Sequence, residues 1–142
     1  MEFKRIFTIK NEEETRAFGL ELGKNARAGQ VIGLIGDLGT GKTALAGYIA
    51  EGLGITETIS SPTFNIIKEY NSGRLPFYHF DVYRLTDPEE LFDTGAEEYF
   101  DGDGLCVVEW ADMVKGELPE DSLFICIEYG EAEGERIYRC TF

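Results

Sequence analysis

The stretch GDLGTGKT at residues 36–43 constrains the fold more than any other part of this sequence. It fits the pattern G-x-x-x-x-G-K-[ST] without a mismatch and directly follows the apolar run VIGLI at residues 31–35. The two glycines that the pattern requires, Gly36 and Gly41, permit backbone angles and a close approach to a ligand that a side chain forbids. The pattern predicts a buried strand, a phosphate-binding loop and then a helix.

Each part of this loop has a predicted role in binding a nucleoside triphosphate. Consecutive backbone N–H groups at the start of a helix form an anion site. Lys42 is expected to reach the β- and γ-phosphates, and the Thr43 hydroxyl is expected to be a ligand of Mg²⁺. The nucleotide-binding residues predicted in the loop are Gly36, Asp37, Leu38, Gly39, Thr40, Gly41, Lys42 and Thr43.

Two acidic residues at the ends of apolar runs are candidates for the metal site. A phosphate loop works with an acid that usually ends a neighbouring strand. Glu109 ends the run LCVVE, and Asp81 follows the run FYHF. Aspartate is usual at this place, but the longer side chain of Glu109 can reach Mg²⁺ directly or through water. The sequence predicts that at least one of the two lies at the metal.

Three other residues near these motifs each allow two interpretations. Thr63, in SSPTF, is either a switch residue that senses the γ-phosphate or part of a turn shaped by Pro62. Trp110, the only tryptophan, either packs in the core or flanks a binding surface, which is the nucleotide pocket or the surface that meets a partner. His79, the only histidine, lies on the same side of its strand as Asp81. It is either a hydrogen-bonded core residue or half of a catalytic pair with Asp81.

The remaining pattern predicts an α/β fold, a P-loop NTPase-like sheet with a parallel core, antiparallel edge strands and flanking helices. One domain is expected over residues 1–142. Strands are predicted at residues 3–9, 31–35, 104–110, 121–129 and 134–142, and on both sides of a turn at 71–74. Helices are predicted at residues 11–28, 42–54 and, opening at Asp87-Pro88, 88–93.

Charge and composition narrow the class of protein further. A net charge of -14 repels a phosphate backbone, and no Lys/Arg cluster interrupts it, so tight direct binding of nucleic acid is not expected. No apolar run is long enough to span a membrane, and the N-terminus lacks the apolar core of a signal peptide, so a cytoplasmic protein is expected. The three cysteines, none in a C-x-x-C pair, are expected to be reduced and mostly buried.

Several segments taken together resemble the TsaE (YjeE) family of ATPases. GDLGTGKT, SPTF, YHFDVYRL, ELFDTGAEEYF and VVEW stand in the order and spacing of that family, over about residues 10–115. The resemblance implies an Mg²⁺-dependent ATPase that supports synthesis of threonylcarbamoyladenosine in tRNA. It also implies a TsaD–TsaB pair as partner, in which TsaD transfers the threonylcarbamoyl group.

The same resemblance implies roles for the central residues of the site. Lys42 and its loop bind the phosphates, and Thr43 and Glu109 bind Mg²⁺. Asp81 assists hydrolysis or positions water. Lys42, Asp81 and Glu109 are therefore the predicted catalytic residues.

The resemblance also implies roles for residues around the site. Thr63 lies in the switch segment, and Trp110 lies near the nucleotide. Arg136, in EGERIYR, and Thr15, in NEEET, lie on the side of the base.

Other classes of nucleotide-binding protein are open alternatives. A small-molecule or nucleotide kinase needs an acceptor pocket and an arginine-bearing lid, and residues 57–85 supply only Arg74 and Arg84. A GTPase-type switch needs an N-K-x-D motif, which is absent. A nucleotide-gated interaction module uses the same loop without depending on turnover. No arginine finger can be identified from spacing, so slow hydrolysis that a partner stimulates is expected.

Overall fold

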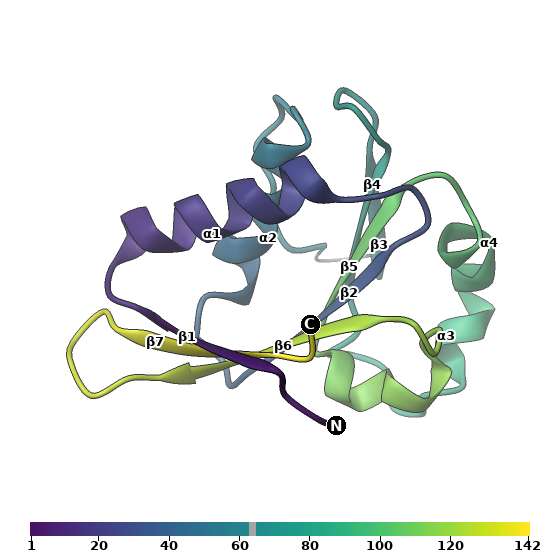
Figure 1. The fold of residues 1–142 in the computed structure, drawn as a ribbon. Coiled ribbons are helices and arrows are strands. Elements are labelled where there is room, and N and C mark those ends of the chain that lie inside the picture. Colours follow the sequence, from purple (N-terminus) through teal and green to yellow (C-terminus); the bar gives the residue numbers. More distant parts are fainter. Residues whose placement is uncertain (63–64) are drawn as a thin grey trace.

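The seven strands of the computed structural model, which describes residues 1–62 and 65–142, form one mixed sheet in the order β1-β7-β6-β2-β5-β4-β3 (Figure 1). The central strands β6, β2, β5 and β4 are parallel, and the remaining pairs at both edges are antiparallel. The predicted α/β fold with a parallel core is confirmed. The strands are β1 (Arg5–Ile9), β2 (Val31–Ile35), β3 (Ile67–Tyr70), β4 (Phe77–Asp81), β5 (Leu105–Glu109), β6 (Leu123–Tyr129) and β7 (Arg136–Cys140).

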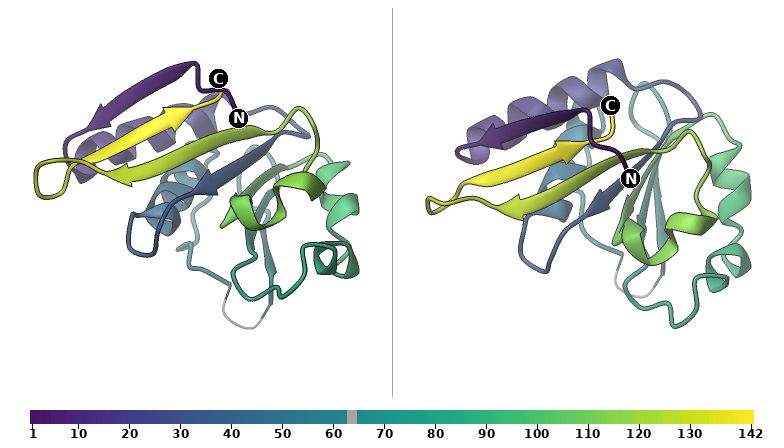
Figure 2. Two further views of the ribbon diagram at one scale, coloured as in Figure 1. Left: turned by 90° about the horizontal axis from the view of Figure 1, so that it is seen from below. Right: turned by 60° about the horizontal axis from the view of Figure 1, so that its bottom comes forward.

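Helices cover both faces of this sheet (Figure 2). On one face lie α1 (Glu12–Asn25) and α2 (Lys42–Gly52); on the other lie α3 (Glu90–Asp93), α4 (Ala96–Phe100) and the 3₁₀ helix η1 (Ala111–Glu117). Strand β5 contributes Leu105 and Val107 to the first core and Cys106 and Val108 to the second. This double burial explains why its sequence is a continuous apolar run instead of an alternating one.

Helix α1 begins as predicted but ends three residues early. The side chain of Asn11 accepts a hydrogen bond from the Glu14 N–H at 2.9 Å, which caps the first turn. At the other end Ala26 is extended. The Arg74 guanidinium, from the turn between β3 and β4, donates to the carbonyl oxygens of Gly23, Lys24 and Ala26. These bonds satisfy carbonyl groups that a longer helix would have paired internally.

The segment between β4 and β5 differs most from the prediction. The predicted helix at residues 88–93 is shorter, because Asp87 and Pro88 belong to a preceding turn in which the Asp87 carboxylate accepts the Glu89 N–H. Gly95, at a φ of 78°, then separates α3 from α4, a helix that the sequence pattern did not reveal.

The predicted state of the cysteines is confirmed. All three thiols are free; Cys106 and Cys140 are buried, and Cys126 is half-buried. Among the residues that the structure describes, no helix combines the length and apolar character needed to cross a bilayer.

Candidate nucleotide-binding site

The loop between β2 and α2 has the backbone shape of a phosphate-binding turn. Gly39 and Gly41 have φ angles of 84° and 100°, which side-chain-bearing residues rarely adopt. Gly36 is required for a different reason, since a Cβ there would lie 2.7 Å from the carbonyl oxygen of Ile127 on β6. The Thr40 hydroxyl donates back to the Asp37 carbonyl at 2.7 Å and closes the turn.

Lys42, the first residue of α2, is held inside this loop. Its side chain is buried, and Nζ donates to the carbonyl oxygens of Gly36 at 2.6 Å and Asp37 at 2.9 Å. The same ammonium lies 4.0 Å from the centre of the Trp110 ring. Burial lowers the pKa of Lys42, while the nearby carboxylates, Glu109 first among them, oppose that shift. These contacts hold the ammonium against the first two residues of the loop.

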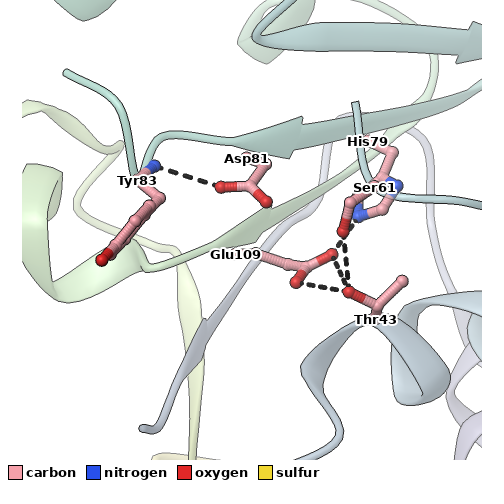
Figure 3. Close-up of polar contacts among 6 residues, drawn as sticks. All are labelled: Thr43, Ser61, His79, Asp81, Tyr83 and Glu109. Atoms are coloured by element: carbon pink, nitrogen blue, oxygen red, sulfur yellow. Dashed lines mark hydrogen bonds and ion pairs between the residues drawn. The ribbon is translucent and has the colours of Figure 1, made fainter. Parts of the chain in front are cut away.

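Thr43 and Glu109 contact each other directly (Figure 3). The Thr43 hydroxyl lies 2.8 Å from Oε1 and 3.1 Å from Oε2 of Glu109, whose side chain is almost fully buried at the end of β5. The hydroxyl of Ser61 also lies 2.8 Å from Thr43 Oγ1. The two predicted ligands of Mg²⁺ therefore face each other at the start of α2.

Asp81 lies beside Glu109 because β4 and β5 pair in parallel with these residues as Cα partners. The Asp81 carboxylate accepts the N–H of Tyr83 at 3.1 Å (Figure 3). Burial raises its pKa above the ordinary range of aspartate, and the nearby Glu109 carboxylate adds to this. Both predicted acids thus stand at the carboxyl ends of neighbouring strands, facing α2.

The single histidine contacts Glu109 instead of Asp81. His79 Nε2 lies 2.5 Å from Glu109 Oε2, and no hydrogen bond joins His79 to Asp81 among the described contacts. His79 is completely buried. Of the two interpretations, the structure favours the hydrogen-bonded core histidine, and the His79–Asp81 pair is not formed.

Trp110 both packs against a core and flanks the site. It is half-buried at the margin of the core under α3 and α4, and its ring centre lies 4.6 Å from that of Tyr83. Its backbone has a φ of 61°, which is rare for a bulky side chain and costs energy. In this backbone conformation the indole ring lies against the Lys42 ammonium.

Two cavities meet at the loop. One of about 280 Å³ is lined by the phosphate-side residues, including Lys42, Thr43 and Glu109. The other, of about 370 Å³, is lined by Thr15, Thr40 and Arg136 among others, and Gly41 and Ala44 line both. A nucleotide whose phosphates occupy the first cavity can extend its sugar and base into the second. Thr15 and Arg136, both predicted on the side of the base, do lie together there.

Arg136 and Tyr129 hold the loop from the hairpin of β6 and β7. The Arg136 guanidinium donates to the Thr40 carbonyl at 3.0 Å, and the Tyr129 hydroxyl donates to the Leu38 carbonyl at 3.1 Å. The guanidinium also lies 4.7 Å from the centre of the Tyr129 ring. Sequence analysis missed the role of Tyr129, because only its place opposite Arg136 across the hairpin brings it to the loop.

Other features are less suited to nucleotide chemistry. A cavity of about 440 Å³ between α1 and β1 is larger than the cavities at the loop, but its lining is mostly apolar and includes Phe7, Phe18 and Leu22.

Thr63, the predicted switch residue, lies outside the described residues. Of the two arginines in residues 57–85, Arg74 is hydrogen-bonded to the end of α1, while Arg84 lines a small cavity with Ser61 and Asp81.

Comparison with known proteins gives a consistent result. A family model described as threonylcarbamoyl adenosine biosynthesis protein TsaE matches residues 9–138. The chain is 52% identical over 118 residues to the tRNA threonylcarbamoyladenosine biosynthesis protein TsaE of Bacillus subtilis, covering 83% of this chain and 73% of that protein. It is 42% identical to the Treponema pallidum protein of the same name, covering 89% and 93%. The crystal structure of Bacillus subtilis YdiB superposes with a TM-score of 0.83 at 41% identity, covering 99% of this chain and 86% of that one.

Proposed function

The chain belongs to the TsaE family of tRNA threonylcarbamoyladenosine biosynthesis proteins, and from this premise we propose that it is an Mg²⁺-dependent ATPase serving that modification. One ATPase domain spans residues 1–142. The protein acts on tRNA chemistry through TsaD–TsaB-like partners, because a net charge of -14 opposes direct binding of RNA.

The observation that carries this proposal is the contact of Thr43 with Glu109 beside the buried Lys42. A hydroxyl and a carboxylate are the oxygen ligands that Mg²⁺ prefers, so this donor set fits the ion. The described residues contain no group of three or more His, Cys, Asp or Glu that could hold a metal by themselves. A nucleotide site does not need one, because phosphate oxygens and water complete the shell around Mg²⁺.

The protein's own residues supply binding and orientation. The loop N–H groups and Lys42 bind the β- and γ-phosphates, while Thr15 and Arg136 line the space for the sugar and base. Asp81 accepts a hydrogen bond from the attacking water and orients it. Mg²⁺, when bound by Thr43 and Glu109, neutralises charge on the phosphates.

Slow hydrolysis by the isolated protein is part of this proposal. Neither arginine between β3 and α3 contacts Lys42 or Thr43 in the described contacts, and Arg74 is committed to α1. An arginine supplied by a partner can raise phosphoryl transfer by roughly a thousandfold or more. Stimulation by a partner is therefore expected.

Equilibrium binding and product analysis test the site. The protein should bind ATP in preference to GTP, more tightly with Mg²⁺ than with EDTA, and Lys42→Ala should lose that binding. Incubation with ATP should release inorganic phosphate. A phosphorylated acceptor instead of free phosphate would indicate a kinase, and binding without any turnover, partners present, would indicate a nucleotide-gated interaction module.

A further inference from the structure

His79 contacts the carboxylate of Glu109, which is proposed to bind Mg²⁺. It is the only histidine of the chain, and its side chain is fully buried on β4. His79 pairs in register with Val107, two residues before Glu109 on β5, so both side chains point to the face that α2 covers. The distance from His79 Nε2 to Glu109 Oε2 is 2.5 Å (Figure 3).

The direction of this hydrogen bond follows from the surroundings of the ring. Nε2 faces a carboxylate oxygen, which can only accept, so Nε2 carries the hydrogen and donates it. The other ring nitrogen, Nδ1, is buried and has no hydrogen-bond partner among residues 1–62 and 65–142. The carboxylate of Glu109 therefore receives a separate donor at each oxygen, the closer Thr43 contact being at Oε1 and the His79 ring at Oε2.

A glutamate at this place needs such an anchor. Its side chain has one more rotatable bond than that of the aspartate usual in phosphate-loop proteins, so its carboxylate can take more orientations. The imidazole cannot follow it, because the ring is enclosed in the core beside Phe77, at 6.0 Å between ring centres. Fixing Oε2 leaves Oε1 directed at Thr43 and the start of α2.

We propose that His79 is a positioning residue, which holds the Glu109 carboxylate in the orientation that binds Mg²⁺. The inference rests on the proposed function for the Mg²⁺ site and names the residue that shapes it. Groups that orient metal ligands are worth roughly 10- to 100-fold in metal affinity. Loss of the Nε2–H donor should therefore raise the Mg²⁺ concentration needed for tight nucleotide binding and leave metal-free nucleotide binding unchanged.

The test measures affinity for a non-hydrolysable ATP analogue by calorimetry over a series of Mg²⁺ concentrations and in EDTA. We expect His79→Leu to raise the Mg²⁺ midpoint about tenfold or more with no change in EDTA. His79→Gln places an amide N–H at a similar reach and should stay within about threefold of wild type, whereas the shorter His79→Asn should resemble His79→Leu. The Gln and Asn variants, both polar, decide the question if His79→Leu does not fold.

The same substitution made in Glu109→Ala protein distinguishes a positioning role of His79 from a general effect on core packing. In Glu109→Ala protein, adding His79→Leu should not shift the Mg²⁺ midpoint further, because His79 acts only through Glu109. Three results would each overturn the role of His79 without affecting the proposed Mg²⁺ site. They are an unchanged midpoint in folded His79→Leu, equal losses in the Gln and Asn variants, and an additional loss in the Glu109→Ala background. A wild-type protein whose nucleotide binding does not respond to Mg²⁺ would overturn the proposed site together with it.

Discussion

The ammonium of Lys42 lies 4.0 Å from the centre of the Trp110 ring, over the face of the indole. The backbone of Trp110 is in the left-handed region, at a φ of 61°. This contact joins Lys42, the lysine proposed to bind phosphate, to the only tryptophan of the chain. We expect a bound phosphate to attract the ammonium away from the ring and from the carbonyl oxygens of Gly36 and Asp37, which it contacts in this structure. The tryptophan is therefore placed to report on the state of the site.

Binding of ATP should change the fluorescence of Trp110. We expect a saturable change in wild-type protein and none in Lys42→Met, which keeps the length of the side chain but loses its charge. Trp110→Phe should lose the signal and still bind ATP by calorimetry. Wild-type protein that binds ATP by calorimetry with constant fluorescence would contradict the assigned coupling.

Removing the charge of Asp81 should slow ATP hydrolysis and leave ATP binding nearly unchanged. Asp81→Asn should lower the rate of ATP hydrolysis about 100-fold or more, because a positioned acid or base contributes roughly 10²- to 10⁴-fold, while ATP affinity changes little. Burial raises the pKa of Asp81, so hydrolysis should also decline on acidification at a higher pH than a free aspartate would require.

The matched control for Asp81 is Asp112→Asn. Asp112 is an exposed acid on η1 that also acts on the charge of Lys42, but it is not at the end of β4. Steady-state phosphate release, with ATP affinity measured separately, distinguishes the two. Equal losses in both variants would show a general charge effect and count against a specific role for Asp81.

Close packing of α1 on α2 makes Gly23 sensitive to substitution. A Cβ at Gly23 would lie 2.1 Å from the Ile49 carbonyl oxygen and 2.7 Å from the Gly52 Cα, which are backbone atoms that cannot move aside cheaply. Gly23→Ala should destabilise the protein by about 1–3 kcal/mol, measured by urea unfolding. Gly47→Ala, in the interior of α2 with its nearest neighbour 3.9 Å away, should instead add up to about 1 kcal/mol. Equal effects would remove the packing argument.

Two buried thiols should make the fold sensitive to alkaline pH. Burial raises the pKa of Cys106 to about 12 and that of Cys140 to about 11, against 9.0 for an unperturbed thiol. Above pH 9 the unfolded chain loses thiol protons that the folded chain retains, so stability present below that pH is lost as pH rises. The expected loss is about 1 kcal/mol per thiol between pH 9 and 10.

Urea unfolding at several pH values checks this dependence. The double variant Cys106→Ala and Cys140→Ala should begin from a lower stability at pH 8, because small cavities replace the thiols. Its stability should nevertheless fall less steeply above pH 9 than that of wild type. An identical slope would mean that these thiols do not carry the alkaline sensitivity.

The parts of the fold that could be predicted are those specified by local sequence. The run VIGLI, the glycines of the loop and the helix from Lys42 form one continuous signal, since strand, turn and helix follow directly along the chain. The buried β5 was equally clear from its unbroken apolar run, which both cores require. The end of each strand also marked Asp81 and Glu109 as candidates.

The parts that could not be predicted depend on register and distant contacts. Alternation placed His79 and Asp81 on one side of a strand, but only the pairing of β4 with β5 brings His79 to Glu109. The early end of α1 depends on Arg74, about 50 residues away in the chain. Helix α4 is too short for a helical period to be visible.

Phosphate release from ATP shows most directly whether this chain is a partner-stimulated ATPase. It is measured for the purified protein alone and with TsaD and TsaB added, with Lys42→Ala as the control. We expect slow release by the protein alone, strong stimulation by the partners, and loss of both in the variant. Release that the partners leave unchanged, or that Lys42→Ala retains in full, would contradict the assignment of this chain as a partner-stimulated ATPase.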